Sequence, residues 1–259
     1  MELRVAYAAC RGNHHSGQEL PCQDVVAGCK WENFGAVVLA DGAGSCLYAA
    51  EGAKTSADEV LRLLQQHGEE WLADELSSIA EEIIASCRTA LVENGYPLDE
   101  QASTLLFALA DEGGRFLCGH LGDGCVFRSS DSSAELISAP ENGDHPNETI
   151  FVTSEGAEEH LRLLQGALRP NEAVVLCSDG AAAALYQWQE RSCAPAVHRM
   201  SSWLGLADEA EVAQAIEMNL DTIFREKTDD DMSVAVLSYR GADDGSEREG
   251  ESYVGPFDD

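Results

Sequence analysis

An apolar run of residues ends abruptly in an acidic, glycine-rich turn at positions 34–44, FGAVVLADGAG. The same layout recurs at residues 174–180, VVLCSDG, where a second apolar run leads into Asp179-Gly180. A third acidic stretch, KTDDD at residues 227–231, directly precedes the apolar run MSVAVL. Short β-branched and apolar runs bounded by Gly, Asp and Ser predict strands. Each strand therefore carries a carboxylate at its end, on rigid backbone that suits a ligand site.

The rest of the chain divides into blocks of helices and blocks of strands. Apolar residues recur with helical spacing over residues 46–66, 70–94, 181–187 and 209–224. Strands are expected at 3–9, 24–29, 34–39, 103–110, 116–120, 125–129, 135–138, 149–153, 161–168, 173–177 and 232–239. The polar segments 11–23 and 140–147 are expected to be loops. Consecutive strands with separate helical blocks predict an α+β fold of antiparallel sheets covered by helices, and not a parallel doubly wound sheet.

No internal repeat and no linker divides the chain, so residues 1–240 are expected to form a single domain. Residues 241–259 are rich in Asp, Glu, Gly and Ser, which predicts a disordered acidic tail that aids solubility. Two other roles for the tail stay open: it could fold back to compete for cations at the site, or it could mimic a phosphorylated substrate.

The charge balance narrows the class of partner. The chain holds 47 Asp and Glu against 16 Lys and Arg, a formal net charge of −31. Such a surface repels nucleic acid and anionic membranes, and it suits metal ions or basic protein segments. No apolar stretch reaches the length of about 18 residues that a membrane span needs, and the first ten residues do not resemble a signal peptide. Nine scattered cysteines without a C-x-x-C pair exclude a zinc ribbon and favour reduced thiols in the cytoplasm.

The acidic strand ends suggest a site for hard divalent cations. Mg²⁺ and Mn²⁺ prefer carboxylate and water oxygens, and Gly beside Asp lets an ion approach the backbone carbonyl. Another interpretation stays open from the residues alone, because Asp-Gly after a strand is a common turn signal. The acidic run 229–231 could likewise be a solvated loop.

Five motifs follow one another in an order typical of the metal-dependent protein phosphatases of type 2C. That family has an Asp before a strand, then Asp-Gly-x-Gly, Gly-Asp, Ser-Asp-Gly and Asp-Asn-Met-Thr-Val. The matching residues here are Gln23-Asp24, Asp41-Gly42-Ala43-Gly44, Leu121-Gly122-Asp123, Ser178-Asp179-Gly180 and Asp230-Asp231-Met232-Ser233-Val234. The chain resembles this family up to about Arg240, and residues 12–15, 21–24 and 147–149 resemble a bacterial subgroup of it.

The resemblance implies a four-layer α-β-β-α sandwich, in which two antiparallel β-sheets are flanked by α-helices. It also implies two Mn²⁺ or Mg²⁺ ions and a third, more weakly held one. Asp41 would bridge the pair, the Gly42 carbonyl would bind one ion, Asp179 and Asp230 the other, and Asp123 with Asp179 the third. Asp24 would orient metal-bound water as a catalytic residue.

The implied reaction is hydrolysis of phosphoserine or phosphothreonine in proteins by a metal-bridging hydroxide, without a covalent intermediate. The resemblance also implies a signalling hydrolase whose substrate is a phosphoprotein, such as the target of a bacterial Ser/Thr kinase. Small phosphorylated metabolites stay open as substrates.

The chain departs from the family where the substrate phosphate is usually held. Glu19 stands at the position of the usual phosphate-binding Arg. Arg11, His14 or His15 could supply that contact from the same loop, and His15 is the preferred candidate because it fits the subgroup pattern. The alternative is that Arg11, His14 and His15 are exposed loop residues without a role in binding phosphate.

Two further departures concern the acidic motifs. Ala43 replaces the His that many members use to protonate the leaving alcohol, so His15, His120 or water would have to do so. Asp231 replaces the usual Asn and adds a negative charge near the metals.

The sequence allows three rival interpretations. Residues 193–199, CAPAVHR, have the C-x₅-R spacing of cysteine-dependent phosphatases, but they lack Gly, contain Pro195 and follow no apolar strand. The missing Arg and Ala43 suggest a catalytically silent fold that binds or senses a phosphoprotein. A structural Ca²⁺ site is disfavoured because the chain has no EF-hand spacing.

Overall fold

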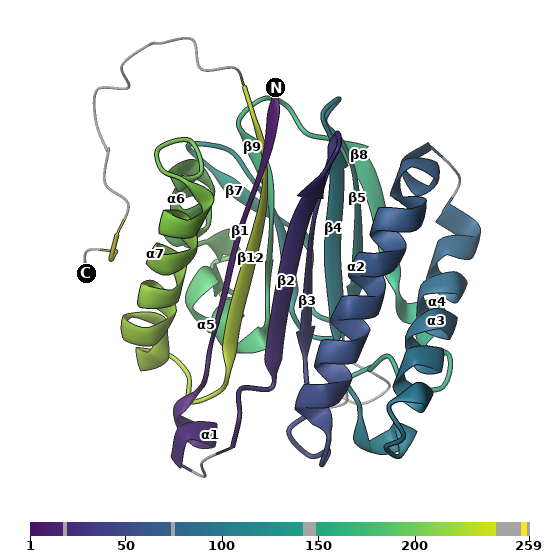
Figure 1. Cartoon of the computed structure of the whole chain (residues 1–259). Helices are drawn as coiled ribbons and strands as arrows, with labels where there is room; N and C mark the ends of the chain where they lie inside the picture. Colours follow the sequence, from purple (N-terminus) through teal and green to yellow (C-terminus); the bar gives the residue numbers. More distant parts are fainter. Residues whose placement is uncertain (18–19, 74–75, 142–148, 242–254, 258–259) are drawn as a thin grey trace.

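The computed structural model describes residues 1–17, 20–73, 76–141, 149–241 and 255–257. Two five-stranded antiparallel sheets stack face to face, with helices on both outer sides (Figure 1). The first sheet has the order β1 (Glu2–Cys10), β12 (Met232–Arg240), β9 (Glu172–Cys177), β6 (Cys125–Ser129) and β7 (Ala134–Ser138). The second has the order β2 (Asp24–Trp31), β3 (Phe34–Asp41), β4 (Leu105–Asp111), β5 (Arg115–Leu121) and β8 (Arg162–Ala167). The predicted α+β sandwich of two antiparallel sheets flanked by helices is confirmed.

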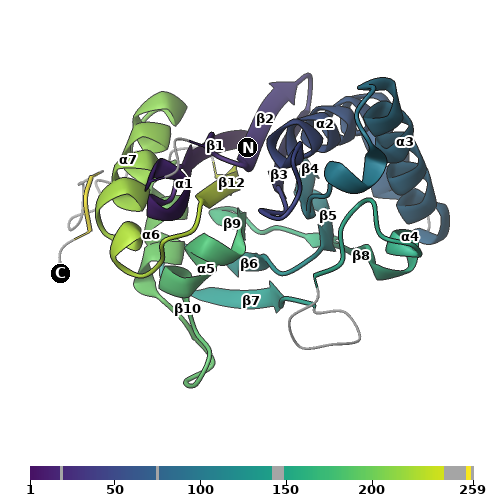
Figure 2. The ribbon, with the colours of Figure 1, turned by 90° about the horizontal axis from the view of Figure 1, so that it is seen from below.

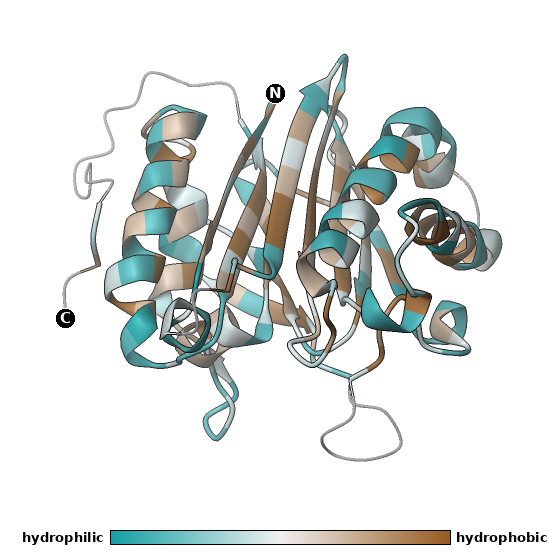
Figure 3. Ribbon diagram, turned by 60° about the horizontal axis from the view of Figure 1, so that its bottom comes forward, coloured by the Kyte–Doolittle hydropathy of each residue, from teal (hydrophilic) through white to brown (hydrophobic). Residues whose placement is uncertain are grey.

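The strands are apolar on both faces because each sheet is covered by the other sheet on one face and by helices on the other. Successive side chains of a strand point to opposite faces. In β3, Val37 and Leu39 therefore pack between the two sheets, whereas Val38 and Ala40 pack against the helices. Figure 3 shows hydrophobic residues along the strands and hydrophilic residues over the outer helices.

The helices form the two outer layers (Figure 2). The second sheet is covered by α2 (Ala49–Ala73) and α3 (Ile79–Glu93), against which the short α4 (Ala157–His160) packs. The first sheet is covered by α5 (Asp179–Leu185), α6 (Pro195–Trp203) and α7 (Glu209–Thr222). The remaining elements are α1 (Asn13–Gly17), the hairpin β10 (Tyr186–Gln187) with β11 (Ser192–Cys193), and the 3₁₀ turns 76–78, 98–100 and 224–226.

Four of the element predictions were wrong or displaced. The expected strand 149–153 does not form: Ile150 and Val152 are buried from an irregular segment that ends in a turn at residues 152–153. Helix α1 lies inside the expected loop 11–23, and α2 runs on to Ala73 because Trp71 and Leu72 extend its buried face. Helix α6 was missed, although a Pro in the first turn is a start signal.

The predicted tail lies mostly outside the described residues. Only Gly241 and residues 255–257 of the segment 241–259 are described, and Phe257 packs against the core beside α6 and α7. The division into one domain and a tail stays a prediction. In the part of the chain that the structure describes, every helix is too short or too polar to cross a membrane.

Candidate metal centre

Three carboxylates that are far apart in the sequence meet at one end of the sandwich. Asp41 ends β3, Asp123 lies in the turn between β5 and β6, and Asp179 follows β9 at the start of α5. Each offers an oxygen within 4.8 Å of the other two. Strand register contributes to the convergence. In the second sheet, Leu39 of β3 pairs with Leu106 of β4, and β4 pairs in turn with β5, so Asp41 and Asp123 follow strands of one sheet. In the facing sheet, Cys125 of β6 pairs with Cys177 of β9, so Asp123 and Asp179 lie beside paired strand ends. Figure 2 looks onto this end, where α1 and α5 lie.

A fourth carboxylate lies directly beneath this cluster. Asp24 pairs with Asp41 across the β2–β3 hairpin and is only 4% exposed. Neither of its oxygens makes a well-formed hydrogen bond within the described residues. Burial raises the pKa of Asp24 to about 7, against an opposing effect from the hydroxyls of Ser178 and Ser233. Two carboxyl groups placed opposite each other in a sheet repel unless a proton or a cation compensates.

The other carboxyl groups are perturbed in the same direction. Burial first, and then the charges of Asp24 and Asp179, raise the pKa of Asp41 well above its usual range. Burial, together with Asp123 and Asp230, raises the pKa of Asp179 to about 6. Because the raised pKa values reflect unfavourable negative charge, a bound cation would stabilise the ionised carboxylates of this cluster.

The residues present fit a hard divalent cation. All the clustered donors are oxygens, the class of ligand that Mg²⁺ and Mn²⁺ prefer. The orphaned oxygens of Asp24 leave a buried acceptor for water or an ion. Two hydroxyls fix the arrangement: Thr149 Oγ1 donates to Asp123 Oδ2 at 2.6 Å, and Thr104 Oγ1 accepts from the Asp41 N–H at 3.0 Å.

Asp41, Asp123 and Asp179 line a pocket of about 330 Å³, whereas the buried Asp24 does not. Gly42 and the exposed Asp230 line it too, although Asp230 stands outside the tight group of three. Gly42 cannot be replaced easily, because a Cβ there would lie 2.7 Å from the Ala49 carbonyl oxygen. Sequence reasoning missed Gln23, Thr104 and Phe151 as pocket residues. The polar pair Ser103-Thr104 before an apolar strand was the available signal.

Asp231 organises the loop on the opposite wall. It is 2% exposed, and it accepts hydrogen bonds from the N–H of Gly12 at 2.7 Å and of Gln23 at 2.6 Å. His15 Nδ1 lies 2.9 Å from the same carboxylate. Since an ionised carboxylate only accepts, His15 Nδ1 carries a proton, and the other ring nitrogen, Nε2, is left to make further contacts. Asp231 was expected to add a negative charge near the metal site, and its charge does help to raise the pKa of Asp24.

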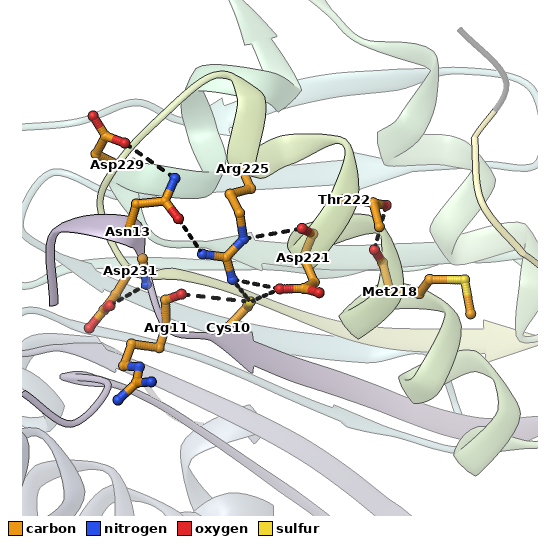
Figure 4. Close-up of polar contacts among 10 residues, drawn as sticks. Cys10, Arg11, Asn13, Met218, Asp221, Thr222, Arg225, Asp229 and Asp231 are labelled. Carbon is orange, nitrogen blue, oxygen red and sulfur yellow. Dashed lines mark hydrogen bonds and ion pairs between the residues drawn. The ribbon is translucent and has the colours of Figure 1, made fainter. Parts of the chain in front are cut away.

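The loop that carries His15 is fastened along residues 221–231 (Figure 4). Arg225 donates to Asn13 Oδ1 at 2.8 Å and to Asp221 Oδ1 at 2.6 Å. Asn13 Nδ2 in turn donates to Asp229, and the His14 N–H donates to the Asp229 carbonyl at 2.9 Å. These contacts hold His15, 7% exposed, at the pocket wall.

Other predicted residues lie elsewhere. Arg11 is exposed, donates to the Leu20 carbonyl at 3.2 Å and is not among the pocket residues. His120 is fully buried near Ser138 and Arg162, and burial lowers its pKa to about 3, so it stays neutral and does not line the pocket. Glu19 lies outside the described residues.

The cysteine-phosphatase alternative finds no support in the structure. Cys193 lies in β11 and lines a separate groove, to which Asp41, Asp123 and Asp179 do not contribute, and Pro195 begins α6. Burial raises the pKa of the Cys193 thiol, whereas a nucleophilic cysteine needs a lowered one.

Comparisons with known proteins agree with this geometry. The family model described as Protein phosphatase 2C matches residues 11–221. Serine/threonine-protein phosphatase 3 of Escherichia coli K12 is 29% identical over 176 residues, which cover 62% of this chain and 67% of that protein.

Two solved structures share the fold. The serine/threonine phosphatase of S. agalactiae has a TM-score of 0.63 at 16% identity, with 93% of this chain and 100% of that chain covered. The catalytic domain of the serine/threonine protein phosphatase PstP, in complex with two manganese ions, has a TM-score of 0.59 at 17% identity, with 91% and 97% covered. The chain therefore belongs to the protein phosphatase 2C family and is a metal-dependent protein phosphatase.

Proposed function

We propose that this protein hydrolyses phosphoserine and phosphothreonine esters in proteins. One observation supports this above the others: the carboxylates of Asp41, Asp123 and Asp179 converge over a buried, orphaned Asp24. The relative from Escherichia coli is named a serine/threonine-protein phosphatase, which supports the same substrate class.

We assign the ion ligands residue by residue. Asp41 would be shared by two Mn²⁺ or Mg²⁺ ions, the Gly42 carbonyl would serve one, and Asp179 with Asp230 the other. Asp123 with Asp179 would hold a third, weaker ion. Bound ions of this kind acidify water and neutralise charge that develops on a transferring phosphoryl group.

The chain's own residues would hold and move protons. Asp24 pairs with Asp41 across the β2–β3 hairpin, and its buried oxygens, which have no hydrogen-bond partner within the described residues, would orient water beside the ions. His15 is held by Asp231 at the pocket wall, and in the imidazolium form, in which both ring nitrogens carry a proton, its Nε2–H would contact the phosphate or protonate the leaving alcohol. We favour His15 over Arg11 for the phosphate contact, because the Arg11 guanidinium is engaged by Leu20.

The substrate would be a phosphoprotein modified by a Ser/Thr kinase. The net charge of −31 favours substrates with basic segments beside the phosphorylated residue. All nine cysteines are unpaired, which supports a role in signalling within the reducing cytoplasm.

The test is turnover of p-nitrophenyl phosphate and a phosphothreonine peptide with Mn²⁺, with Mg²⁺ and with EDTA. Asp179→Asn should abolish metal-dependent turnover, whereas the matched change Asp58→Asn, on the exposed face of α2, should leave it unchanged. Folded protein that binds Mn²⁺ without any turnover would instead indicate the silent phosphoprotein-binding alternative, which the absence of a His at Ala43 motivates.

A further inference from the structure

A notch between α6 and the C-terminal end of α7 holds the aromatic ring of Phe257. We refer to the four residues Arg199, Trp203, Asn219 and Phe224 together as the tail notch. The Phe257 ring stacks on Trp203 with centroids 5.1 Å apart and on Phe224 at 6.4 Å. The Arg199 guanidinium carbon lies 6.0 Å from the centre of the same ring. Aromatic and cationic groups thus surround one side chain from a segment distant in sequence.

The Asn219 side chain makes hydrogen bonds to the backbone on both sides of Pro256. It accepts from the Phe257 N–H at 2.8 Å and donates to the Gly255 carbonyl at 3.2 Å. Its remaining donor is used by the Ala215 carbonyl at 2.7 Å. One side-chain amide therefore satisfies a donor and an acceptor of the same short peptide, as a neighbouring strand would.

The position of Asn219 is the unusual feature. It is fully buried on the apolar face of α7, in line with Val212, Ile216 and Leu220. A buried amide is unfavourable unless its hydrogen-bonding groups are paired. Two of the three hydrogen bonds of the Asn219 side chain are made with the tail. The bound tail segment therefore supplies most of the pairing that this buried amide requires.

The bound segment has a recognisable pattern. Gly255 is buried, Pro256 is exposed and Phe257 is partly buried against the core. The segment therefore places a buried Gly and a partly buried aromatic residue two positions apart, with an exposed residue between them.

We propose that the tail notch is a peptide-recognition site whose occupant is this chain's own segment Gly255-Pro256-Phe257, bound in cis and exchangeable with the same peptide in trans. A peptide joined to its own binding site by a short linker has an effective concentration on the order of 1 mM. If the peptide binds in trans with a Kd on the order of 100 µM, the tail occupies the notch about ten times more often than it leaves it free.

The test measures binding and not turnover, so it is independent of the phosphatase proposal. A fluorescent peptide of residues 252–259, SYVGPFDD, is titrated by anisotropy against full-length wild type and full-length Phe257→Ala. The peptide should bind Phe257→Ala, and should bind wild type about tenfold more weakly because its own tail competes. The same peptide with Ala in place of Phe should bind neither protein.

Two further variants act as controls. Pro256→Ala, which changes an exposed side chain, should behave as wild type. Adding Arg199→Ala to Phe257→Ala should weaken peptide binding about two- to fivefold, through loss of the cation–π contact. Equal affinity for wild type and Phe257→Ala, or no binding to Phe257→Ala up to about 1 mM peptide, would overturn the proposal.

Discussion

Replacing Asp231 by Asn tests the arrangement of the loop that carries His15. The buried carboxylate accepts two backbone N–H groups, from Gly12 and Gln23, on its two different oxygens. An Asn side chain has one oxygen and one NH₂ group, so whichever way it is turned, one of the two backbone donors faces another donor. His15 can change tautomer to accommodate the amide, but the backbone groups cannot.

The expected loss follows from that unpaired group. A hydrogen bond to a charged group contributes about 1.5–3 kcal/mol. For a domain of this size, about 1 kcal/mol changes the Tm by about 2–4 °C, so Asp231→Asn should lower the Tm by about 3–12 °C. The control is Asp229→Asn on the same loop: the exposed side chain keeps an oxygen that can accept from Asn13, so the change should alter stability by less than about 0.5 kcal/mol.

The assay is calorimetric unfolding in excess Mn²⁺, beside turnover of a phosphothreonine peptide. If Asp231 positions His15, then Asp231→Asn and His15→Ala should each lower kcat, and the double variant should lose little more than either alone. An unchanged Tm in Asp231→Asn would refute the hydrogen-bond argument. Additive effects on kcat would refute the role of Asp231 through His15.

Three further predictions concern Gly12, the carboxylate cluster and Cys193. Gly12→Ala should destabilise the fold by about 1–3 kcal/mol, because a Cβ there would lie 2.3 Å from the backbone of residue 230; Gly17→Ala, with nothing within 4 Å, is the matched control in thermal unfolding. In EDTA, the stability should fall as the pH rises from about 4 to about 7. The reason is that Asp24 and Asp179 have pKa values of about 7 and about 6 in the folded protein, above the usual value of about 3.9, so the folded state binds protons more tightly than the unfolded chain. Excess Mn²⁺ should flatten that slope in melting curves, and a slope of the opposite sign in EDTA would contradict the assigned burial. Cys193→Ser should leave turnover within about twofold, because a thiol whose pKa is raised is not the nucleophile; abolished activity would revive the cysteine mechanism.

Local patterns predicted the elements whose formation depends on near neighbours. The β2–β3 hairpin and strands β6 and β12 lie within a few residues of their predicted bounds, because β-branched runs between turn residues favour strands in most contexts. The segment 149–153 has a similar composition but stays irregular, and its Val152 N–H donates to the Ser103 carbonyl at 2.9 Å outside any strand ladder. Helix α6 was missed because its apolar positions are few and gain their stability from the sheet beneath.

The sequence by itself determined which residue types could hold a metal and in what order they occur, because five short motifs are readable without a structure. Only the tertiary structure decided which of them meet. Register places Asp24 opposite Asp41, burial removes His120 from consideration, and Asp231 turns toward a loop more than 200 residues away. Phe257 likewise bonds Asn219, although the sequence of residues 241–259 predicts a solvated tail. These contacts join residues distant in the chain, and their strength depends on burial and geometry that no local pattern encodes.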